Sequence, residues 1–258
     1  MISAIFHPGS GLGDQLFRYI TARTLAEKNG TEFSMVGKEY FKGKNFINLD
    51  YGVENSISFE IQMPAGKIVP KEPVWEEGTR YYNPEINFLT EGIIDGNFQD
   101  ERYWDVDKVK EWLKTEPIDM PDDLCVINFR GGEFSYIPDL FLPQEYWDKA
   151  IEEMRKINPK MEFEVHTDDP ATAKKFFPDF RIWDNQMITA DKMYSHMGYN
   201  WKNIRYAKYL ILTNSAFGIL PALMNEKAQH IIAPRYWARR NTKQWQLPQN
   251  YYKRFKYI

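Results

Sequence analysis

Residues 1–30 read MISAIFHPGSGLGDQLFRYITARTLAEKNG and join three local patterns in one run. Residues 2–6 are apolar except for Ser3 and predict a short buried strand. A glycine-rich turn follows at residues 9–13, and from Leu16 onward apolar side chains recur at helical spacing. The pattern stops at Asn29-Gly30, a usual signal for the end of a helix. Strand, glycine turn and helix in this order predict the first unit of an α/β fold.

The second half of the chain repeats this alternation of strand and helix. Apolar runs predict strands at residues 124–129, 161–165, 209–213 and 229–233, and helical spacing predicts helices at residues 146–157, 171–177 and 219–224. The alternation predicts a parallel sheet with helices on both faces. Ligands of such sheets bind just beyond the carboxyl ends of the strands, so the segments after these strands are the candidate site.

The length of 258 residues is compatible with one or two domains. Residues 92–96 predict a further strand end and residues 106–113 a short helix, whereas residues 37–92 show no clear pattern. A polar, proline-bearing connector follows, TEPIDMPDD at residues 115–123. We therefore expect an N-terminal α/β domain at residues 1–118 and a C-terminal one at residues 119–258.

The composition excludes several classes of protein. Hydrophobic residues make up 43% and charged residues 27% of the chain, which excludes a disordered chain, a collagen and a simple coiled coil. The single cysteine, Cys125, rules out an intrachain disulfide and lies in an apolar run that predicts a buried thiol. With neither a long apolar segment nor a signal-peptide pattern, we expect a cytoplasmic protein.

Positive charge is concentrated at the C-terminal end. Residues 235–258 hold seven basic residues, no acidic residue and seven aromatic rings, although the net charge of the whole chain is −3. This pattern is compatible with nucleic acid, with an anionic membrane surface at the inner face of the membrane, or with a phosphate site beside a sugar. A terminal helix that packs its rings on the core and leaves its charges in water is the fourth interpretation.

The glycine turn does not match the two common phosphate loops. Gly13 is followed by Asp14-Gln15 rather than by lysine and serine or threonine, which excludes a P-loop. Counted from Gly9, the sixth position is Asp14, which excludes the dinucleotide fingerprint. Either the backbone approaches a ligand at a helix N-terminus, which favours anions, or the glycines only allow a tight turn.

Arg130, Asp168 and Ser215 follow three of the predicted strands. Arginine can hold two phosphate oxygens at once, although a surface ion pair is the alternative. Asp168 can accept hydrogen bonds from a nucleobase, while Asp169 before Pro170 predicts a helix N-cap. Ser215 can donate to a phosphate. The four histidines show no metal-ligand spacing, so we expect no metal site; they are His7, His166, His196 and His230.

Six segments in chain order resemble motifs of the alpha-1,2-fucosyltransferases, glycosyltransferase family 11. They are GLGDQLFRY at 11–19 (family G-G-L-G-N-Q-x-F-Q-Y), GNFQDERYW at 96–104 (G-Y-x-Q-S-E-K-Y-F), NFRGGEF at 128–134 (H-x-R-R-G-D-Y), EVHTDD at 164–169 (F-S-D-D), ILTNSAFG at 211–218 (I-I-S-N-S-T-F-S) and IAPRYW at 232–237 (V-I-A-P-x-x-W). The resemblance covers nearly the whole chain.

The resemblance implies a GT-B architecture, in which two Rossmann-like α/β domains face a cleft and the C-terminal domain binds the nucleotide. It implies transfer of L-fucose from GDP-fucose to a hydroxyl of an oligosaccharide or glycan acceptor, with inversion, without a metal or another cofactor, and without nucleic acid as a partner. A galactoside 2-alpha-L-fucosyltransferase in glycan or polysaccharide assembly fits this pattern.

Carried over to this sequence, the resemblance assigns Arg130 to the donor diphosphate. The expected donor-binding residues are Gly11, Gly13, Gln15, Asn128, Arg130, Glu133, Thr167, Asp168, Asn214, Ser215, Ala216 and Phe217. Asp14, a carboxylate in the glycine turn, is our first candidate for the general base, and Glu101 and Glu133 follow it.

The sequence also departs from the family pattern. The second arginine is Gly131 here, the histidine is Asn128, the aspartate is Glu133, a threonine is Ala216, and the asparagine of the glycine turn is Asp14. The alternative is therefore a relative that binds a GDP-sugar or a glycan with altered donor specificity or without turnover.

Overall fold

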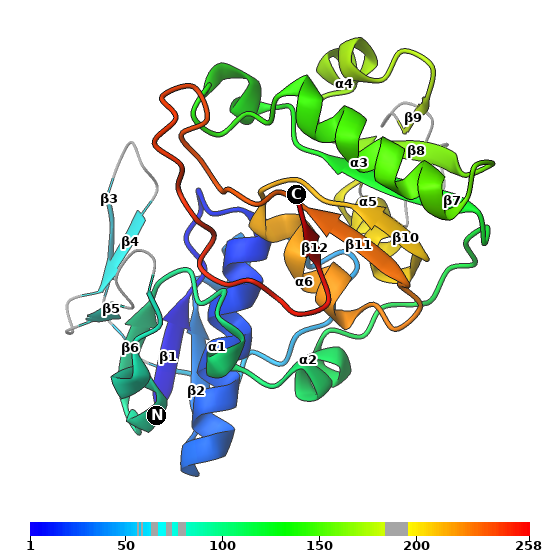
Figure 1. Cartoon of the computed structure of the whole chain (residues 1–258). Coiled ribbons are helices and arrows are strands. Elements are labelled where there is room, and N and C mark those ends of the chain that lie inside the picture. Colours follow the sequence, from blue (N-terminus) through cyan, green and yellow to red (C-terminus); the bar gives the residue numbers. More distant parts are fainter. Residues whose placement is uncertain (56, 58, 63–66, 71–73, 77–80, 184–195) are drawn as a thin grey trace. The chain divides into compact units, whose positions relative to one another are not determined.

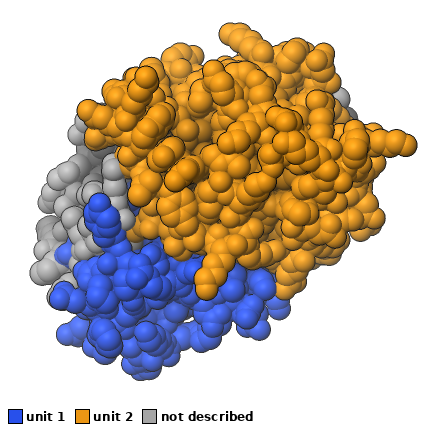
Figure 2. Space-filling model, viewed as in Figure 1, with its two compact units in different colours: residues 1–114 blue, residues 115–258 orange. Residues whose placement is uncertain are grey.

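The computed structural model describes the whole chain except residues 56, 58, 63–66, 71–73, 77–80 and 184–195. It contains two compact units, Met1–Lys114 and Thr115–Ile258 (Figure 2). The division falls at the start of the proline-bearing connector, and the expected boundary after residue 118 lies within that connector. Each unit contains its own parallel sheet with helical connections, which confirms the α/β fold class.

Unit 1 is built on a four-stranded parallel sheet in the order β2-β1-β6-β5. Its strands are β1 (Ile2–Ile5), β2 (Phe33–Val36), β5 (Val74–Glu76) and β6 (Gly92–Asp95), and β3 (Phe59–Gln62) pairs antiparallel with β4 (Lys67–Pro70). Helix α1 (Leu12–Asn29) ends at Gly30, which takes the left-handed φ of 64° that a glycine adopts without strain. The other described residues of the unit form the 3₁₀ turns Lys38–Tyr40, Pro84–Phe88 and Glu101–Tyr103, helix α2 (Val106–Trp112) and the segments between them.

Unit 2 is built on a six-stranded parallel sheet in the order β12-β11-β10-β7-β8-β9 (Figure 1). The strands are β7 (Leu124–Phe129), β8 (Glu162–Thr167), β9 (Arg181–Trp183), β10 (Tyr209–Ile211), β11 (His230–Ala233) and β12 (Lys256–Tyr257). The helical segments are the 3₁₀ turn Glu133–Tyr136 and the helices α3 (Gln144–Ile157), α4 (Pro170–Phe176), α5 (His196–Tyr206) and α6 (Ala216–Met224).

The core of unit 2 is rich in aromatic rings. The apolar stripe of α3 places Trp147 against the sheet, where only 1% of the side chain is exposed. Its ring lies 5.3 Å from the Phe129 ring and 5.6 Å from the Phe177 ring. Burial of such a ring stabilises the layer, and its removal costs about 3–5 kcal/mol. Cys125 on β7 is fully buried, as the apolar run predicted.

The C-terminal segment is not the helix considered from its composition. After α6, the only regular elements of the fully described residues 225–258 are strands β11 and β12. Arg239 and Lys243 take left-handed φ angles that interrupt any helix, and β12 completes the sheet beside β11. The rings of Tyr252 and Phe255 are nevertheless buried in the unit, as that interpretation required. Among the described helices, none has the length and apolar character needed to cross a membrane.

Candidate ligand-binding site

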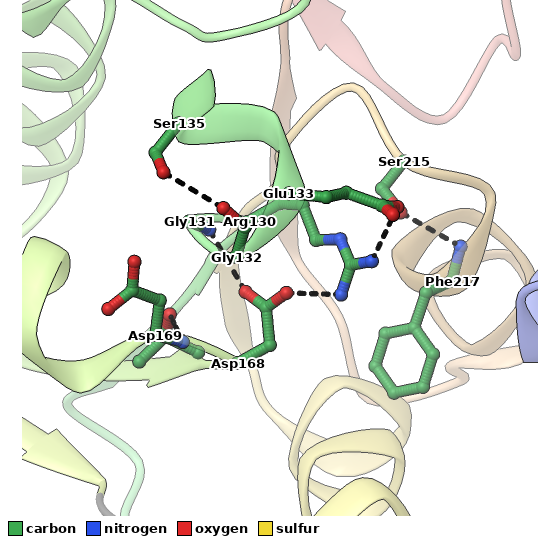
Figure 3. Close-up of polar contacts among 10 residues, drawn as sticks. Arg130, Gly131, Gly132, Glu133, Ser135, Asp168, Asp169, Ser215 and Phe217 are labelled. Carbon is green, nitrogen blue, oxygen red and sulfur yellow. Dashed lines mark hydrogen bonds and ion pairs between the residues drawn. The ribbon is translucent and has the colours of Figure 1, made fainter. Parts of the chain in front are cut away.

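The candidate residues of unit 2 gather at the carboxyl edge of its sheet (Figure 3). Arg130 directly follows β7, Asp168 directly follows β8, and Ser215 lies between β10 and α6. Because β8, β7 and β10 are neighbours and parallel, their carboxyl ends meet at one edge. Segments that are far apart in the sequence thus form one group of side chains.

Arg130 is held by two carboxylates. One amino group of its guanidinium forms an ion pair with the Asp168 Oδ2 atom, and the other donates to Glu133 Oε1 at 3.0 Å. The guanidinium also lies 5.5 Å from the centroid of the Phe134 ring. The ion pair that sequence reasoning kept as an alternative is therefore present. With one arginine and two carboxylates, this group carries a formal net charge of −1.

Gly131 and Gly132 let the loop after β7 lie against the loop after β8. The Gly131 amide donates to Asp168 Oδ1 at 2.9 Å. A Cβ atom on Gly131 would lie 2.6 Å from the Asp169 Cβ, and one on Gly132 would overlap the Asp168 carboxylate. An arginine at position 131, the residue of the fucosyltransferase pattern, has no room in this arrangement.

The loop after β8 is fixed by hydrogen bonds of its own. Asp169 is the N-cap of α4 and accepts from the Thr172 amide at 3.0 Å, with Pro170 at the first helical position. This confirms the capping prediction. The buried Thr167 hydroxyl accepts from the Asp169 amide at 2.9 Å. The two bonds fix the backbone on both sides of Asp168 and so orient its carboxylate.

Helix α6 presents its N-terminus at the same edge. Ser215 caps it, and the hydroxyl accepts from the Phe217 amide at 3.4 Å. Ala216 is buried, and the Phe217 ring packs edge-on against Trp201 at 5.8 Å. A helix N-terminus carries partial positive charge and favours anions such as phosphate.

Asn214 positions loops at this edge. The side chain is 1% exposed, and its amide donates to the Leu140 carbonyl at 2.7 Å and to the Trp237 carbonyl at 2.6 Å. It therefore ties the loop before α6 to the loops that follow β7 and β11. Asn214 was expected among the donor-binding residues, and the observed contacts give it a positioning role.

Asn128, at the end of β7, holds a buried acceptor. The residue is 5% exposed, and its Oδ1 atom has no hydrogen-bond partner among the described residues. A Cβ atom on Gly218 of α6 would lie 2.5 Å from this oxygen, so the two segments are in close contact. A buried polar atom without a partner is uncommon and suggests a ligand or water that completes it.

The remaining expected residues lie in unit 1. Gly11 is the N-cap of α1, Gly13 is buried in its first turn, and Asp14 is half-buried beside it. Gln15 is fully buried; its amide donates to the Tyr40 carbonyl at 2.9 Å, and its oxygen accepts from the Lys42 amide at 3.0 Å. Gln15 thus holds the start of α1 against the loop after β2.

Sequence reasoning missed a charged cluster in unit 1. His7 follows β1 and its Nε2 lies 3.2 Å from Asp95 Oδ2 at the end of β6, while Arg18 Nε donates to Asp95 Oδ1 at 2.7 Å. Arg18 also donates to the Ser10 hydroxyl in the glycine turn at 3.2 Å. Burial raises the pKa of Asp95, but the hydrogen bond with His7 and the charge of Arg18 outweigh it and lower the pKa to about 2.

The pairing of β1 with β6 brings His7 and Asp95 together. Both residues follow or end apolar runs, so a sequence search for polar residues at strand ends could have selected them. A histidine held by a carboxylate can take up a proton in acid–base chemistry. In the described part of the chain, no group of three or more His, Cys, Asp or Glu side chains is arranged to hold a metal ion.

Comparisons with known proteins add a distant structural likeness. No protein-family model matches the chain, and no curated protein matches it. Among solved structures, E. coli heptosyltransferase WaaC with ADP aligns with a TM-score of 0.49 and 14% identity, over 100% of this chain and 93% of that chain. At this level of similarity, the fold assignment rests on the two parallel sheets themselves.

Proposed function

We propose that the chain is an inverting, metal-independent glycosyltransferase of the GT-B type that moves L-fucose from GDP-fucose to a hydroxyl of an acceptor glycan. One observation carries the proposal. Three segments that resemble fucosyltransferase motifs touch one another at the carboxyl edge of unit 2. The segment at 128–134 contacts that at 164–169 through Arg130 and Asp168, and contacts that at 211–218 through Asn128 and Gly218.

The chemistry of these groups suits a nucleotide diphosphate. Amides of the first turn of α6 and the guanidinium of Arg130 can bind phosphate oxygens. The Asp168 carboxylate and the Asn128 oxygen can accept hydrogen bonds from the N–H groups of a guanine base. Within unit 2, the proposed donor-binding set keeps Asn128, Arg130, Asp168, Ser215, Ala216 and Phe217 from the sequence expectation. Thr167 and Asn214 act through the loops that they hold, and Glu133 competes with the donor for Arg130.

The proposed reaction is a single displacement. The acceptor oxygen forms a bond to the anomeric carbon while the bond from that carbon to the phosphate oxygen breaks, and GDP leaves with the electron pair. Arg130 and the α6 amides would stabilise the charge that develops on the leaving phosphate. A general base takes the proton of the acceptor hydroxyl. Asp14 is the first proposed base, and His7, held by Asp95, joins Glu101 and Glu133 as a further candidate.

Two carboxylates already bind Arg130, so a donor diphosphate has to replace one of them. Glu133 is 68% exposed and three residues from Arg130, and such surface pairs contribute about 1 kcal/mol or less. Asp168 is held in addition by the Gly131 amide. We therefore expect the diphosphate to displace Glu133 from Arg130, while Asp168 stays.

Calorimetric titration in EDTA tests the proposed function. GDP, GDP-fucose and GDP-mannose are titrated into the wild type, Arg130→Ala and, as a matched control, Arg155→Ala on the exposed face of α3. We expect binding of about micromolar Kd that Arg130→Ala weakens at least about tenfold and Arg155→Ala does not change. Absence of GDP binding at millimolar concentration would contradict the proposal, and preference for GDP-mannose would contradict fucose as the donor sugar.

The alternative is a nucleotide-sugar-binding relative without turnover. The observation in its favour is that Arg130 is the one cation that pairs with Asp168 and Glu133 among the described residues, because Asp169 occupies the space that a second arginine at position 131 needs. Release of GDP from GDP-fucose distinguishes the two functions. If the chain binds GDP-fucose and releases GDP only when an acceptor is added, the enzyme is supported. If it binds GDP-fucose and releases no GDP, the alternative is supported.

A further inference from the structure

A long loop joins β11 to β12 (Figure 1). It carries a pair of stacked aromatic rings. The Tyr236 and Trp245 rings lie 4.9 Å apart at an interplanar angle of 22°. Trp245 is 47% exposed. We call residues 235–247 the aromatic loop. It comes directly after the carboxyl end of β11, beside the edge that holds the candidate donor site.

The aromatic loop is held in place by backbone hydrogen bonds. Ala238 and Gln246 form an antiparallel bridge, and the Trp237 amide donates to the Gln246 carbonyl at 2.6 Å. The Arg239 amide donates to the Asp139 carbonyl at 2.5 Å, and Asn214 binds the Trp237 carbonyl. Asn214 immediately precedes the Ser215 cap of α6. The stacked rings are therefore fixed to the segment that the proposed diphosphate approaches.

Two residues of this loop have a conformation that side chains other than glycine rarely adopt. Arg239 has a φ of 65° and Lys243 a φ of 56°, and only three non-glycine residues of the described chain have positive φ. Such conformations persist only where the surrounding structure imposes them, and they cluster at ligand-binding and active sites as well as in turns. They turn the short segment that brings Trp245 back over Tyr236.

The loop is also a surface of unneutralised positive charge. Arg235, Arg239, Arg240 and Lys243 lie within it, and none of them forms an ion pair with a described carboxylate. Arg240 is half-buried and donates to the Tyr236 carbonyl, while its Nε atom has no partner among the described residues. Burial lowers the pKa of Arg240 to about 10. Partial burial of a cation without a counter-ion is unfavourable, and an anionic ligand would offset that cost.

We propose that the aromatic loop binds an anionic glycan, with a sugar ring against the exposed face of Trp245 and a carboxylate or phosphate group of the glycan on Arg240 and its basic neighbours. The assignment of this glycan as the acceptor rests on the proposed function; the binding itself does not. If the glycan is the acceptor, the proposal restricts the acceptor to oligosaccharides that carry acidic groups. The acceptor would then bind beside the edge that holds the candidate donor site.

The geometry favours a glycan over a lipid surface. Trp245 stacks on Tyr236 and is 47% exposed, and an exposed indole ring is a surface on which a sugar ring can stack. The rings of Tyr252 and Phe255 are buried, and the tail contains no helix that could lie in a membrane interface. Two further basic residues serve the fold, because Arg254 donates to carbonyls at the end of α6 and Lys256 pairs with Glu153.

The test measures glycan binding without any donor. The full chain is applied to an array of sialylated, uronic-acid and phosphorylated oligosaccharides together with their neutral counterparts, and Kd values for the best ligand are then measured by calorimetry. We expect anionic glycans to bind and neutral ones not to bind. Trp245→Ala and Arg240→Gln each weaken binding about tenfold or more, and Phe88→Ala, which removes an exposed ring of unit 1, leaves it unchanged.

Three results would overturn the inference: no binding of any anionic glycan, binding that Trp245→Ala leaves unchanged, or binding only to phosphatidylserine–phosphatidylcholine vesicles that is lost in Trp245→Ala. Calorimetric titration of GDP into Trp245→Ala is the control, and the same Kd as in the wild type would show that the donor edge is intact. Glycan binding without GDP binding would keep the aromatic loop as a glycan site and remove the fucosyltransferase proposal. GDP binding without glycan binding would do the reverse.

Discussion

Asp95 provides a direct test of the charged cluster in unit 1. Its carboxylate accepts from Arg18 and lies 3.2 Å from His7 Nε2, and its side chain is 16% exposed. The pKa of Asp95 is lowered from the ordinary 3.8 to about 2, because the partners outweigh the opposing effect of burial. The folded state therefore favours the ionised carboxylate.

This lowering of the pKa of Asp95 corresponds to about 2 kcal/mol of folding free energy. Because the folded-state pKa lies below the unfolded-state value, this stability is fully present above about pH 4. It is lost as the pH falls from about 4 towards 2. Asp95→Asn removes the charge, so we expect the variant to be about 2 kcal/mol less stable than the wild type at pH 7. The difference should shrink as the pH falls through that window.

The assay is urea unfolding of the full chain, followed by circular dichroism and tryptophan fluorescence between pH 7 and pH 2.5. Glu91→Gln, which neutralises an exposed carboxylate of the same unit, is the control and should stay within about 0.5 kcal/mol of the wild type at every pH. Equal stability of Asp95→Asn and wild type at pH 7 would refute the reasoning. So would a deficit of the same size at pH 7 and pH 2.5.

Four further predictions concern the core of unit 2 and the candidate site. Trp147→Ala should lower the free energy of unfolding by about 3–5 kcal/mol, measured in urea, and a loss below about 1 kcal/mol would show that the ring is not the centre of that core. Glu133→Gln should tighten GDP binding in calorimetry, because it removes the carboxylate that competes for Arg130; weaker binding would instead make Glu133 a donor ligand. Gly131→Ala should cost about 1–3 kcal/mol of stability and weaken GDP binding, since the added Cβ meets the loop after β8, and unchanged values in both assays would show that this loop adapts freely. Asp14→Asn should lower the rate of GDP release in the presence of acceptor with little change in the Kd of GDP, whereas full turnover would exclude Asp14 as the base.

Much of the fold could be predicted from local patterns. The runs at 2–6 and 124–129 are apolar except for Ser3 and Asn128, as expected for strands buried in parallel sheets, and Asn29-Gly30 marks the end of α1 to the residue. Strand β2 and helix α5 were not predicted. Both depend on tertiary packing more than on local pattern: β2 has only four residues, and the first turns of α5 hold Gly198 and Asn200, which are poor helix formers. The conformation of the tail depends on left-handed backbone at Arg239 and Lys243, which no propensity indicates.

For the candidate site too, single residues could be selected from the local sequence, but the contacts between them could not. Arg130 and Asp168 could be selected because each directly follows an apolar run. Their pairing with each other requires the adjacency of β7 and β8, which sequence order alone does not specify. His7 and Asp95 are separated by 88 positions and meet only because β6 pairs with β1. The close approach of Asn128 to Gly218 likewise depends on the packing of α6 against the end of β7.

The central claim is that the carboxyl edge of unit 2 binds a nucleotide diphosphate. A crystal structure of the chain with GDP in EDTA tests it most directly. We predict phosphate oxygens at the first turn of α6, the Arg130 guanidinium bound to them and released from Glu133, and the base within hydrogen-bond distance of Asn128 or Asp168. GDP bound elsewhere, with Arg130 still held by both carboxylates, would contradict the account.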